Sequence, residues 1–239
     1  MSYFDNMVRP CLLDRYKIGE DNYALSFNGT DSIVLIEDSE SLKPTHFTYS
    51  FFIFADRVNV RQALISKRSL TGGGFPDFEY RIGLNDTDTT DNDKLDVRMY
   101  TNSSSSDLIS NGSLQEKQWY HIAFAHSGNE SKIYINGQID SFTNTSVTYD
   151  NTKTDNLIHI GNIFFRGNNV RPFKGLIKNI KMYQSYITDS QALKLYNSEE
   201  INEQLAANYD FSTGEGNILI DKSGNNNNGN IINAEWIKL

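Results

Sequence analysis

The chain of 239 residues has almost no cysteine, because Cys11 is the only one. No disulfide can form within it, which favours a reducing compartment or a core large enough to need no covalent crosslink. It has no run of about 18 apolar residues, and residues 1–19 are too polar for the apolar region of a signal peptide. We therefore expect no membrane insertion and synthesis in the cytoplasm, with display on a virus particle or a cell surface left open.

Basic segments are missing as well. Lys and Arg number 22 against 30 Asp and Glu, which gives a formal net charge of −8. Proteins that bind a phosphate backbone need a basic face, and a membrane-surface patch needs a basic run. The composition therefore excludes nucleic acid from the expected partners.

Aromatic and β-forming residues are plentiful, with 14 Phe and 13 Tyr. The clearest local pattern lies in residues 119–140. Residues 119–126 and 132–136 each alternate as a strand, and a turn at residues 127–130 joins them. Asn136-Gly137 follows, the pair best suited to a type I′ hairpin turn. Three consecutive antiparallel strands are predicted here, a pattern typical of a binding scaffold.

The same rhythm continues along most of the chain. Short strand-like segments separated by Gly, Asn, Asp and Ser clusters, such as Asn85–Asp93 and Asn102–Asp107, predict an all-β sandwich or barrel. Only residues 188–197 look helical, with Thr188 as N-cap and Gln191 at the capping-box position. No boundary divides the chain, so one domain over residues 1–239 is expected. The predicted strands are Tyr23–Phe27, Ser32–Ile36, Phe47–Phe54, Gln62–Ser66, Phe78–Leu84, Lys94–Tyr100, Gln118–His126, Lys132–Asn136, Leu157–Gly161, Lys174–Tyr183, Ala207–Phe211 and Asn217–Asp221.

Five segments in this order resemble a known family: residues 23–42, 47–54, 118–138, 157–162 and 173–197. Together they are similar to the laminin-G-like jelly-roll domains of the concanavalin A-like lectin/glucanase superfamily. The resemblance implies a jelly-roll sandwich of two stacked antiparallel sheets. It also implies ligands bound at rim loops or on the concave sheet face.

The C-terminal segment, residues 206–236, resembles the strands that usually come first in this family. Such an order is that of a circular permutation, which neighbouring termini make physically easy. The segment is too short to bury a core of its own. We expect its strands to pair back into the single sandwich.

The resemblance also implies a calcium site, since many relatives hold Ca²⁺ with rim-loop oxygens. Asn28 and Asp31 match one family turn, and Asp221 matches another. Against this, Lys178-Asn179 replaces the usual acidic pair of the family. The alternative is that both segments are Gly- and Asn-stabilised turns without a metal.

Hydrolysis of glycosidic bonds needs a pair of carboxylates, and glucanases of this superfamily carry them in an E-x-D-x-x-E pattern. The chain has no such pattern. The acidic groups at Glu37–Glu40 and Asp77–Glu79 are expected in solvated turns and loops. The four histidines lack the close spacing of metal ligands, and His121 is expected to pack. We therefore predict a protein without catalytic activity.

Carbohydrate binding needs aromatic platforms with a few fixed hydrogen-bonding groups. Tyr100 and Trp236 are aromatic candidates, although core positions explain them as well. The best candidate is the loop of residues 164–171, in which two Phe, two Arg and two Asn lie close together. The predicted ligand-binding residues are Phe164, Phe165, Arg166, Asn168, Asn169 and Arg171.

The sequence favours a recognition domain that binds carbohydrate or glycoprotein in the manner of a lectin or adhesin. One alternative is a structural or attachment protein of a virus particle or cell surface that binds protein partners or forms homo-oligomers. The other is a divergent glycoside hydrolase. Similarity of fold does not decide among them.

Overall fold

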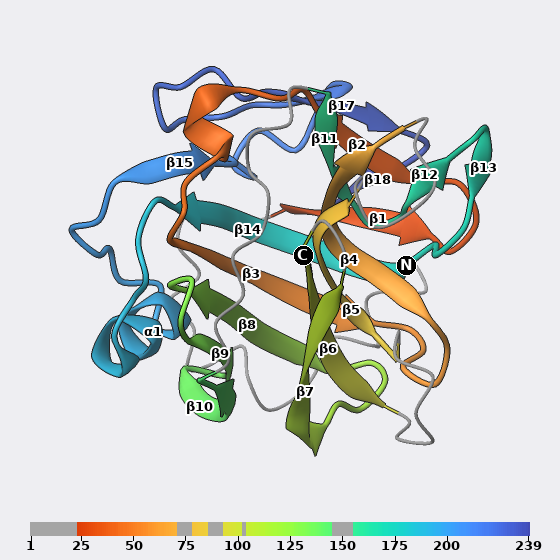
Figure 1. Ribbon diagram of the computed structural model, residues 1–239. Helices are drawn as coiled ribbons and strands as arrows, with labels where there is room; N and C mark the ends of the chain where they lie inside the picture. Colours follow the sequence, from red (N-terminus) through yellow and green to blue (C-terminus); the bar gives the residue numbers. More distant parts are fainter. Residues whose placement is uncertain (1–22, 71–77, 86–92, 102–103, 145–154) are drawn as a thin grey trace.

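The computed structural model describes residues 23–70, 78–85, 93–101, 104–144 and 155–239. Two antiparallel eight-stranded sheets stack as a sandwich (Figure 1), which confirms the predicted fold class. Sheet A has the order β10-β9-β8-β3-β14-β1-β18, with β15 also paired to β14. Sheet B has the order β16-β17-β2-β11-β4-β5-β6-β7. Within the described ranges, no helix has the length and apolar character needed to cross a membrane.

The strands of sheet A are β1 (Tyr23–Asn28), β3 (Phe47–Ala55), β8 (Trp119–His126), β9 (Ser131–Ile135), β10 (Gln138–Thr143), β14 (Lys174–Tyr183), β15 (Leu205–Asn208) and β18 (Glu235–Lys238). Those of sheet B are β2 (Ile33–Ile36), β4 (Gln62–Ser69), β5 (Phe78–Leu84), β6 (Lys94–Tyr100), β7 (Ser105–Ser113), β11 (Asn156–Ile160), β16 (Ile218–Leu219) and β17 (Gly229–Ile232). Outside the two sheets lie the hairpin strands β12 (Phe164–Phe165) and β13 (Asn168–Asn169), the 3₁₀ helix η2 (Glu40–Leu42) and the helix α1 (Asp189–Tyr196).

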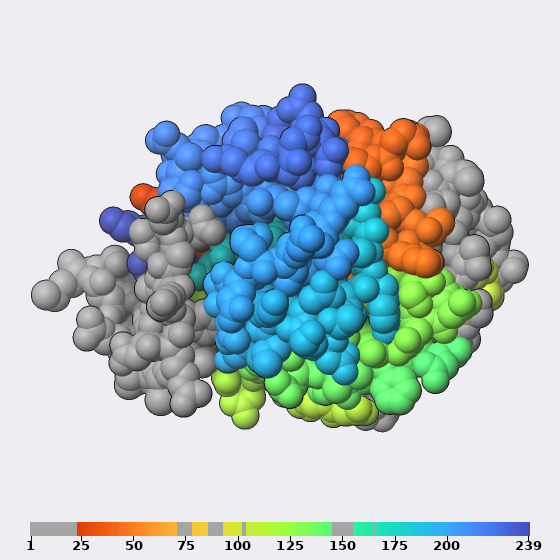
Figure 2. Space-filling model, turned by 90° about the vertical axis from the view of Figure 1, so that its left-hand side faces the viewer, coloured from red at the N-terminus to blue at the C-terminus, as the bar shows by residue number. Residues whose placement is uncertain are grey.

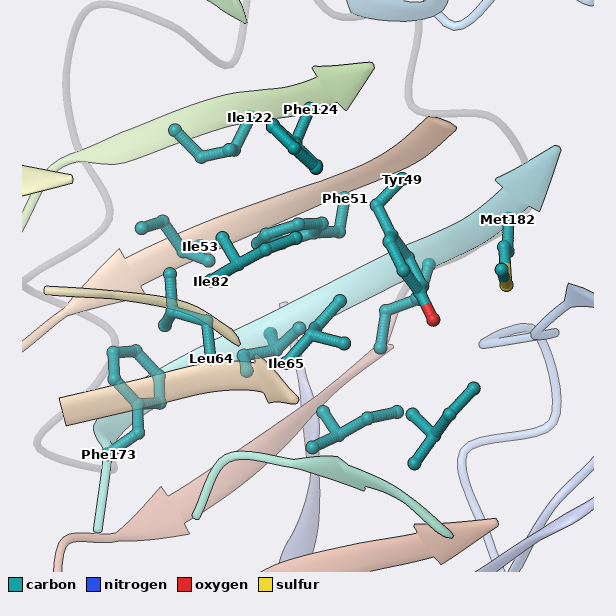
Figure 3. Close-up of a cluster of buried hydrophobic side chains, with 14 of the residues drawn as sticks. Tyr49, Phe51, Ile53, Leu64, Ile65, Ile82, Ile122, Phe124, Phe173 and Met182 are labelled. Carbon is teal, nitrogen blue, oxygen red and sulfur yellow. The ribbon is translucent and has the colours of Figure 1, made fainter. Parts of the chain in front are cut away.

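Alternation along the strands builds the core between the sheets. In β3 the side chains of Phe47, Tyr49, Phe51 and Ile53 face inward and are almost fully buried. Figure 3 shows three of them meeting Ile65 and other apolar side chains from the opposite sheet. The period of two residues is that of a strand with one face on the core. The core therefore follows directly from the sequence pattern.

Two local predictions are confirmed in detail. Asn136 and Gly137 have φ angles of 52° and 75° and join β9 to β10 as a two-residue hairpin turn. The Thr188 side chain accepts a hydrogen bond from the Gln191 backbone, and the Gln191 side chain accepts one from the Thr188 backbone. This reciprocal capping box begins α1 at the predicted place.

The C-terminal strands pair with both sheets. β18 pairs with β1, β17 pairs with β2, and β15 pairs with the C-terminal part of β14. Trp236 packs edge-on against the buried Phe211, with ring centroids 5.6 Å apart. Figure 2 shows this segment, in darker blue, at the top of the view beside the orange segment that contains η2. The tail therefore pairs the otherwise open edges of β1 and β2.

Two expectations were wrong. The Ser-rich stretch predicted as loop contains β7, whose Leu108 faces the core, whereas Ser105 and Ser113 are exposed at the sheet edge. Glu79 lies within the predicted strand Phe78–Leu84, but the expectation that its carboxylate is solvated is wrong, because it lies at a bulge of β5 and is fully buried. The bulge turns its carboxylate inward, where Lys67 neutralises it, so a polar residue occupies an interior position. Asp77 lies outside the described residues.

Candidate functional site

Asn28 and Asp31 form a closed turn between β1 and β2. The Asn28 side-chain oxygen accepts hydrogen bonds from the backbone N–H groups of Thr30, Asp31 and Ser32, at 2.8, 3.0 and 3.3 Å. Its amide nitrogen donates to Asp31 at 2.7 Å, and Asn233 donates to the other Asp31 oxygen at 2.9 Å. This is the arrangement of a self-satisfied Asx turn.

Asp221 is hydrogen-bonded to Asn227 and Asn228, which directly precede β17. This end of β17 pairs with Ile36, at the far end of β2 from the Asn28 turn, so Asp221 and that turn lie at opposite ends of β2. The Asp221 carboxylate accepts four hydrogen bonds, from Asn208 N, Ser223 N, Ser223 Oγ and Asn227 N, all within 2.9 Å. The three predicted metal ligands are thus not brought together.

These residues do not fit a calcium ion. Ca²⁺ needs six to eight oxygen ligands, whereas the oxygens of Asn28 and Asp221 already accept protein donors. Lys178, at the position of the usual acidic pair, holds its ammonium 5.2 Å from the ring centre of Trp119 on the outer face of sheet A. Among the described residues, no three His, Cys, Asp or Glu side chains gather in a way that could hold a metal ion.

Of the acidic residues considered for hydrolysis, Glu37 and Glu40 are exposed as expected, whereas Asp38 and Glu79 form part of a buried ion-pair network. Lys67 lies 3.1 Å from Glu79 and 3.5 Å from Asp38, and Lys43 lies 2.8 Å from Asp38. Burial raises the pKa of Glu79, and the Lys67 charge opposes that effect. Lys67 and Glu79 are fully buried, so this network is an element of the interior.

The β12–β13 hairpin presents the predicted ligand loop to solvent. Arg166 and Gly167 take positive φ angles at its tip, and Arg166, Asn168 and Asn169 are exposed. Phe164 is half-exposed, and its N–H points to His159 Nδ1 at 3.3 Å. At the base of the hairpin, Arg171 N and Asn169 both contact the side chain of buried Asn162. Phe165 is placed in β12 by its backbone.

The register of sheet B assembles a polar row on its outer face, away from the core. Cα partners run from His159 to Ser66, then to Arg81, Arg98 and Asp107, across β11, β4, β5, β6 and β7. Their chain neighbours belong to the core, among them Ile158, Ile65, Ile82, Val97 and Leu108. Alternation therefore turns the row outward. We call these five residues the polar row.

Exposure rises along the polar row. His159, Ser66 and Arg81 are buried, whereas the side chains of Arg98 and Asp107 are 26% and 31% exposed. Arg98 and Asp107 form a two-point ion pair, with N···O distances of 2.5 and 2.7 Å. This geometry fixes the guanidinium plane at the accessible end of the row.

An aromatic pair lies beside the polar row. The rings of Phe78 and Tyr100 stack with centroids 4.8 Å apart, and the Arg68 guanidinium lies 3.8 Å from the Phe78 ring centre. Arg81 donates to the Tyr100 hydroxyl at 3.0 Å, which joins the aromatic pair to the row. The outer face thus combines flat apolar rings with fixed hydrogen-bonding groups.

His121 and Tyr100 were also considered in the sequence, and both are buried side chains. His121 is buried on the outer face of sheet A, where Ser50 Oγ lies 2.9 Å from its Nε2. It packs against Phe52 with ring centroids 4.9 Å apart, consistent with the expected packing role. Tyr100, in contrast, belongs to the aromatic pair on sheet B.

Sequence reasoning missed most of this face. Arg68, Arg81 and Arg98 lie far apart in the chain, and only the strand register unites them. The available signal was the recurrence of polar residues at alternate positions in three strands, each flanked by apolar residues.

Comparison with known proteins places the chain in a family. Residues 28–192, more than half of the chain, match the family model described as the concanavalin A-like lectin/glucanases superfamily. A search of curated proteins gives no match.

Solved structures share the fold. A proposed carbohydrate-binding protein from Bacteroides ovatus has a TM-score of 0.71 and 20% identity, over 91% of this chain and 60% of that one. The CBM40 module of the Ruminococcus gnavus IT-sialidase, bound to α2,3 sialyllactose, has a TM-score of 0.59 and 14% identity, over 72% and 96% of the two chains. Domain 4 of an extracellular arabinanase from Geobacillus stearothermophilus, in complex with arabinotriose, has a TM-score of 0.55 and 22% identity. The match covers 75% of this chain and 78% of that one.

The present chain therefore spans less than two thirds of the Bacteroides ovatus protein, and these likenesses concern the fold. The family match and the two-sheet architecture agree with each other. The chain belongs to the concanavalin A-like lectin/glucanases superfamily.

Proposed function

We propose that this protein is a non-catalytic carbohydrate-binding domain and that the accessible end of the polar row on sheet B, at Arg98 and Asp107, contacts the sugar. The observation that carries the proposal is the partly exposed ion pair of Arg98 and Asp107, which lies beside the partly exposed Phe78 ring of the Phe78–Tyr100 pair. Sugars present hydroxyl groups at their edges and C–H groups on their faces. Fixed polar groups and flat aromatic rings complement these two surfaces.

Several solved structures of the same fold carry sugar ligands, which supports a carbohydrate as the partner. One of them is bound to sialyllactose and another to arabinotriose. The buried state of Asp38 and Glu79, both paired with Lys67, supports a role without catalysis, because general acid–base chemistry needs carboxylates that reach the substrate.

The β12–β13 hairpin supplies a second contact surface in this proposal. Phe164 N–H lies at hydrogen-bond distance from His159, so the hairpin borders the buried end of the polar row. Its exposed side chains complete the rim that was predicted to bind ligand. The hairpin residues assigned to this surface are Phe164, Phe165, Arg166, Asn168, Asn169 and Arg171.

A glycan array, with added Ca²⁺ and with chelator, tests the proposal. We expect binding to a restricted set of glycans, unchanged by the chelator because the predicted calcium ligands are occupied by protein donors. Arg98→Ala then removes the accessible guanidinium of the polar row. By calorimetry we expect an affinity loss of roughly tenfold or more, the scale of a hydrogen bond to a charged group.

The matched control is Lys181→Ala. Lys181 forms a comparable surface ion pair with Glu200 at 2.8 Å, but it lies on β14 of sheet A. We expect this variant to bind like the parent protein. Binding to no glycan, or an equal loss in both variants, would contradict the proposal.

A further inference from the structure

The ion pair of Arg98 and Asp107 keeps hydrogen-bonding capacity at the surface. Arg98 donates from Nε and Nη2 to the two carboxylate oxygens at 2.5 and 2.7 Å, and Tyr100 is a further hydrogen-bond partner of its guanidinium. No other donor to the Asp107 carboxylate lies in the described part of the chain. A guanidinium has five N–H donors and a carboxylate has about four acceptor positions. Both groups can therefore bind a ligand as well as each other, and their side chains are 26% and 31% exposed.

The remaining donor and acceptor positions lie side by side. Because the pair is joined at two points, the guanidinium and the carboxylate share one plane. The second hydrogen of Arg98 Nη2 and the remaining lone pair of Asp107 Oδ2 then face the same side of the pair. The 2.7 Å between these two atoms is close to the separation of two oxygens on adjacent carbons of a sugar ring.

The edge of sheet B leaves the pair open to a ligand. Asp107 lies on β7, the last strand of the sheet, and Ser105 lies two residues before it on the same face. Ser105 is exposed and is the Cα partner of Tyr100, which follows Arg98 by two residues on β6. The Ser105 hydroxyl adds a polar group next to the pair, and the partly exposed Phe78 ring adds an apolar one.

The charge at this place favours a neutral ligand. The positive charge of Arg98 and the negative charge of Asp107 cancel each other within the pair. A ligand carboxylate that approached Arg98 would also meet the carboxylate of Asp107, and like charges side by side oppose binding. The net charge of −8 on the whole chain opposes acidic ligands further.

We propose that Arg98 and Asp107 recognise two adjacent hydroxyl groups of a neutral sugar. The inference rests on the proposed function and names the class of ligand. Arg98 donates to one hydroxyl, and Asp107 accepts from the next. Each hydroxyl is both donor and acceptor, so two neighbouring hydroxyls satisfy the two groups at once. A sugar that lacks either hydroxyl leaves one of the two protein groups without its ligand partner.

Asp107→Asn tests the class of sugar. Calorimetry compares lactose with sialyllactose, and a galactose oligosaccharide with a galacturonic acid oligosaccharide. In the parent protein we expect at least one neutral member to bind about tenfold or more tightly than its acidic counterpart. Asp107→Asn replaces a charged acceptor by a neutral amide, so affinity for that neutral sugar should fall roughly tenfold. Affinity for the acidic counterpart should stay constant or rise, because the repelling charge is gone.

The matched control is Glu200→Gln. Glu200 pairs with Lys181 of sheet A at 2.8 Å, and the control removes the same negative charge from another surface ion pair. It therefore separates the local effect of Asp107 from that of the overall charge. We expect the control to bind both sugars like the parent. Both variants should keep their melting temperatures, because exposed ion pairs contribute little to stability.

Deoxy sugars locate the two hydroxyls. The methyl glycoside of the neutral sugar that binds most tightly is compared with each of its monodeoxy analogues, in the parent protein, in Arg98→Ala and in Asp107→Asn. We expect large losses of affinity at two adjacent positions of the ring. One of these losses should disappear in Arg98→Ala and the other in Asp107→Asn, since a thermodynamic cycle shows non-additivity where two groups are in contact.

The outcomes separate this inference from the proposed function. Losses at positions that are not adjacent, or losses that persist in both variants, would overturn the recognition of adjacent hydroxyls. Acidic sugars that bind more tightly than every neutral one would overturn it as well. In each of these cases a loss of affinity in Arg98→Ala leaves the carbohydrate-binding face standing. No binding to any glycan would overturn the proposed function itself.

Discussion

Replacement of Asp221 by Ala separates a structural carboxylate from a calcium ligand. The change removes the acceptor of four hydrogen bonds, three of them from backbone N–H groups. Asp221 is 8% exposed and its donor Asn227 is 5% exposed, so water replaces the lost acceptor poorly. An unsatisfied buried donor costs roughly 1–3 kcal/mol, and we expect a total of about 3–5 kcal/mol because some donors relax.

Thermal unfolding measures this loss. A chain of this size loses roughly 2–4 °C per kcal/mol, so the melting temperature of Asp221→Ala should fall by about 6–20 °C. Asp221→Asn keeps one carbonyl oxygen as acceptor and should lose less. Both proteins are heated with Ca²⁺ and with chelator, and neither curve should move. A fall below about 2 °C, or a parent protein that Ca²⁺ stabilises and Asp221→Ala does not, would refute the reasoning.

Two further predictions concern a core glycine and a buried histidine. Gly161→Ala should lower the free energy of unfolding in urea by about 2 kcal/mol or more, because φ is +78° and the new Cβ would meet the Phe27 ring. The control is Gly167→Ala, which has a similar φ of +81° but open space around the Cβ, and it should lose less stability. Equal losses in the two variants would contradict this reasoning. Burial lowers the pKa of His121 to about 3, so its contribution to stability is complete above about pH 6.5 and is lost as pH falls toward 3. The parent should therefore lose roughly 2–3 kcal/mol more than His121→Gln between pH 7.5 and 4.5, and parallel pH profiles would refute the assignment.

Local features were predictable because neighbouring residues determine them. Asn136-Gly137 tolerates two positive φ angles, and Thr188 with Gln191 closes a capping box, whatever the rest of the fold does. The inward-facing apolar residues were likewise visible from their period of two. These features fix the strands and the helix, and the family resemblance fixes their stacking.

The candidate site depends on register, which a single sequence does not supply. Ser66, Arg81 and Arg98 become neighbours only through pairing of β4, β5 and β6, with a bulge that shifts the β4–β5 register at Glu79. The predicted metal ligands failed to meet for the same reason. Asp221 and the Asn28 turn lie at opposite ends of β2, a separation set by how the C-terminal strand β17 pairs.

The most direct test of the carbohydrate-binding face is an NMR titration of the arginine side-chain Nε–Hε signals with a glycan that the array identifies. Arg98 lies at the accessible end of the polar row on sheet B, and Arg57 donates to the Gly29 carbonyl in the turn between β1 and β2. We predict that the Arg98 signal shifts in proportion to occupancy while the Arg57 signal stays in place. A saturable shift of Arg57 with an unmoved Arg98 would place the sugar at the β1–β2 turn and contradict the account.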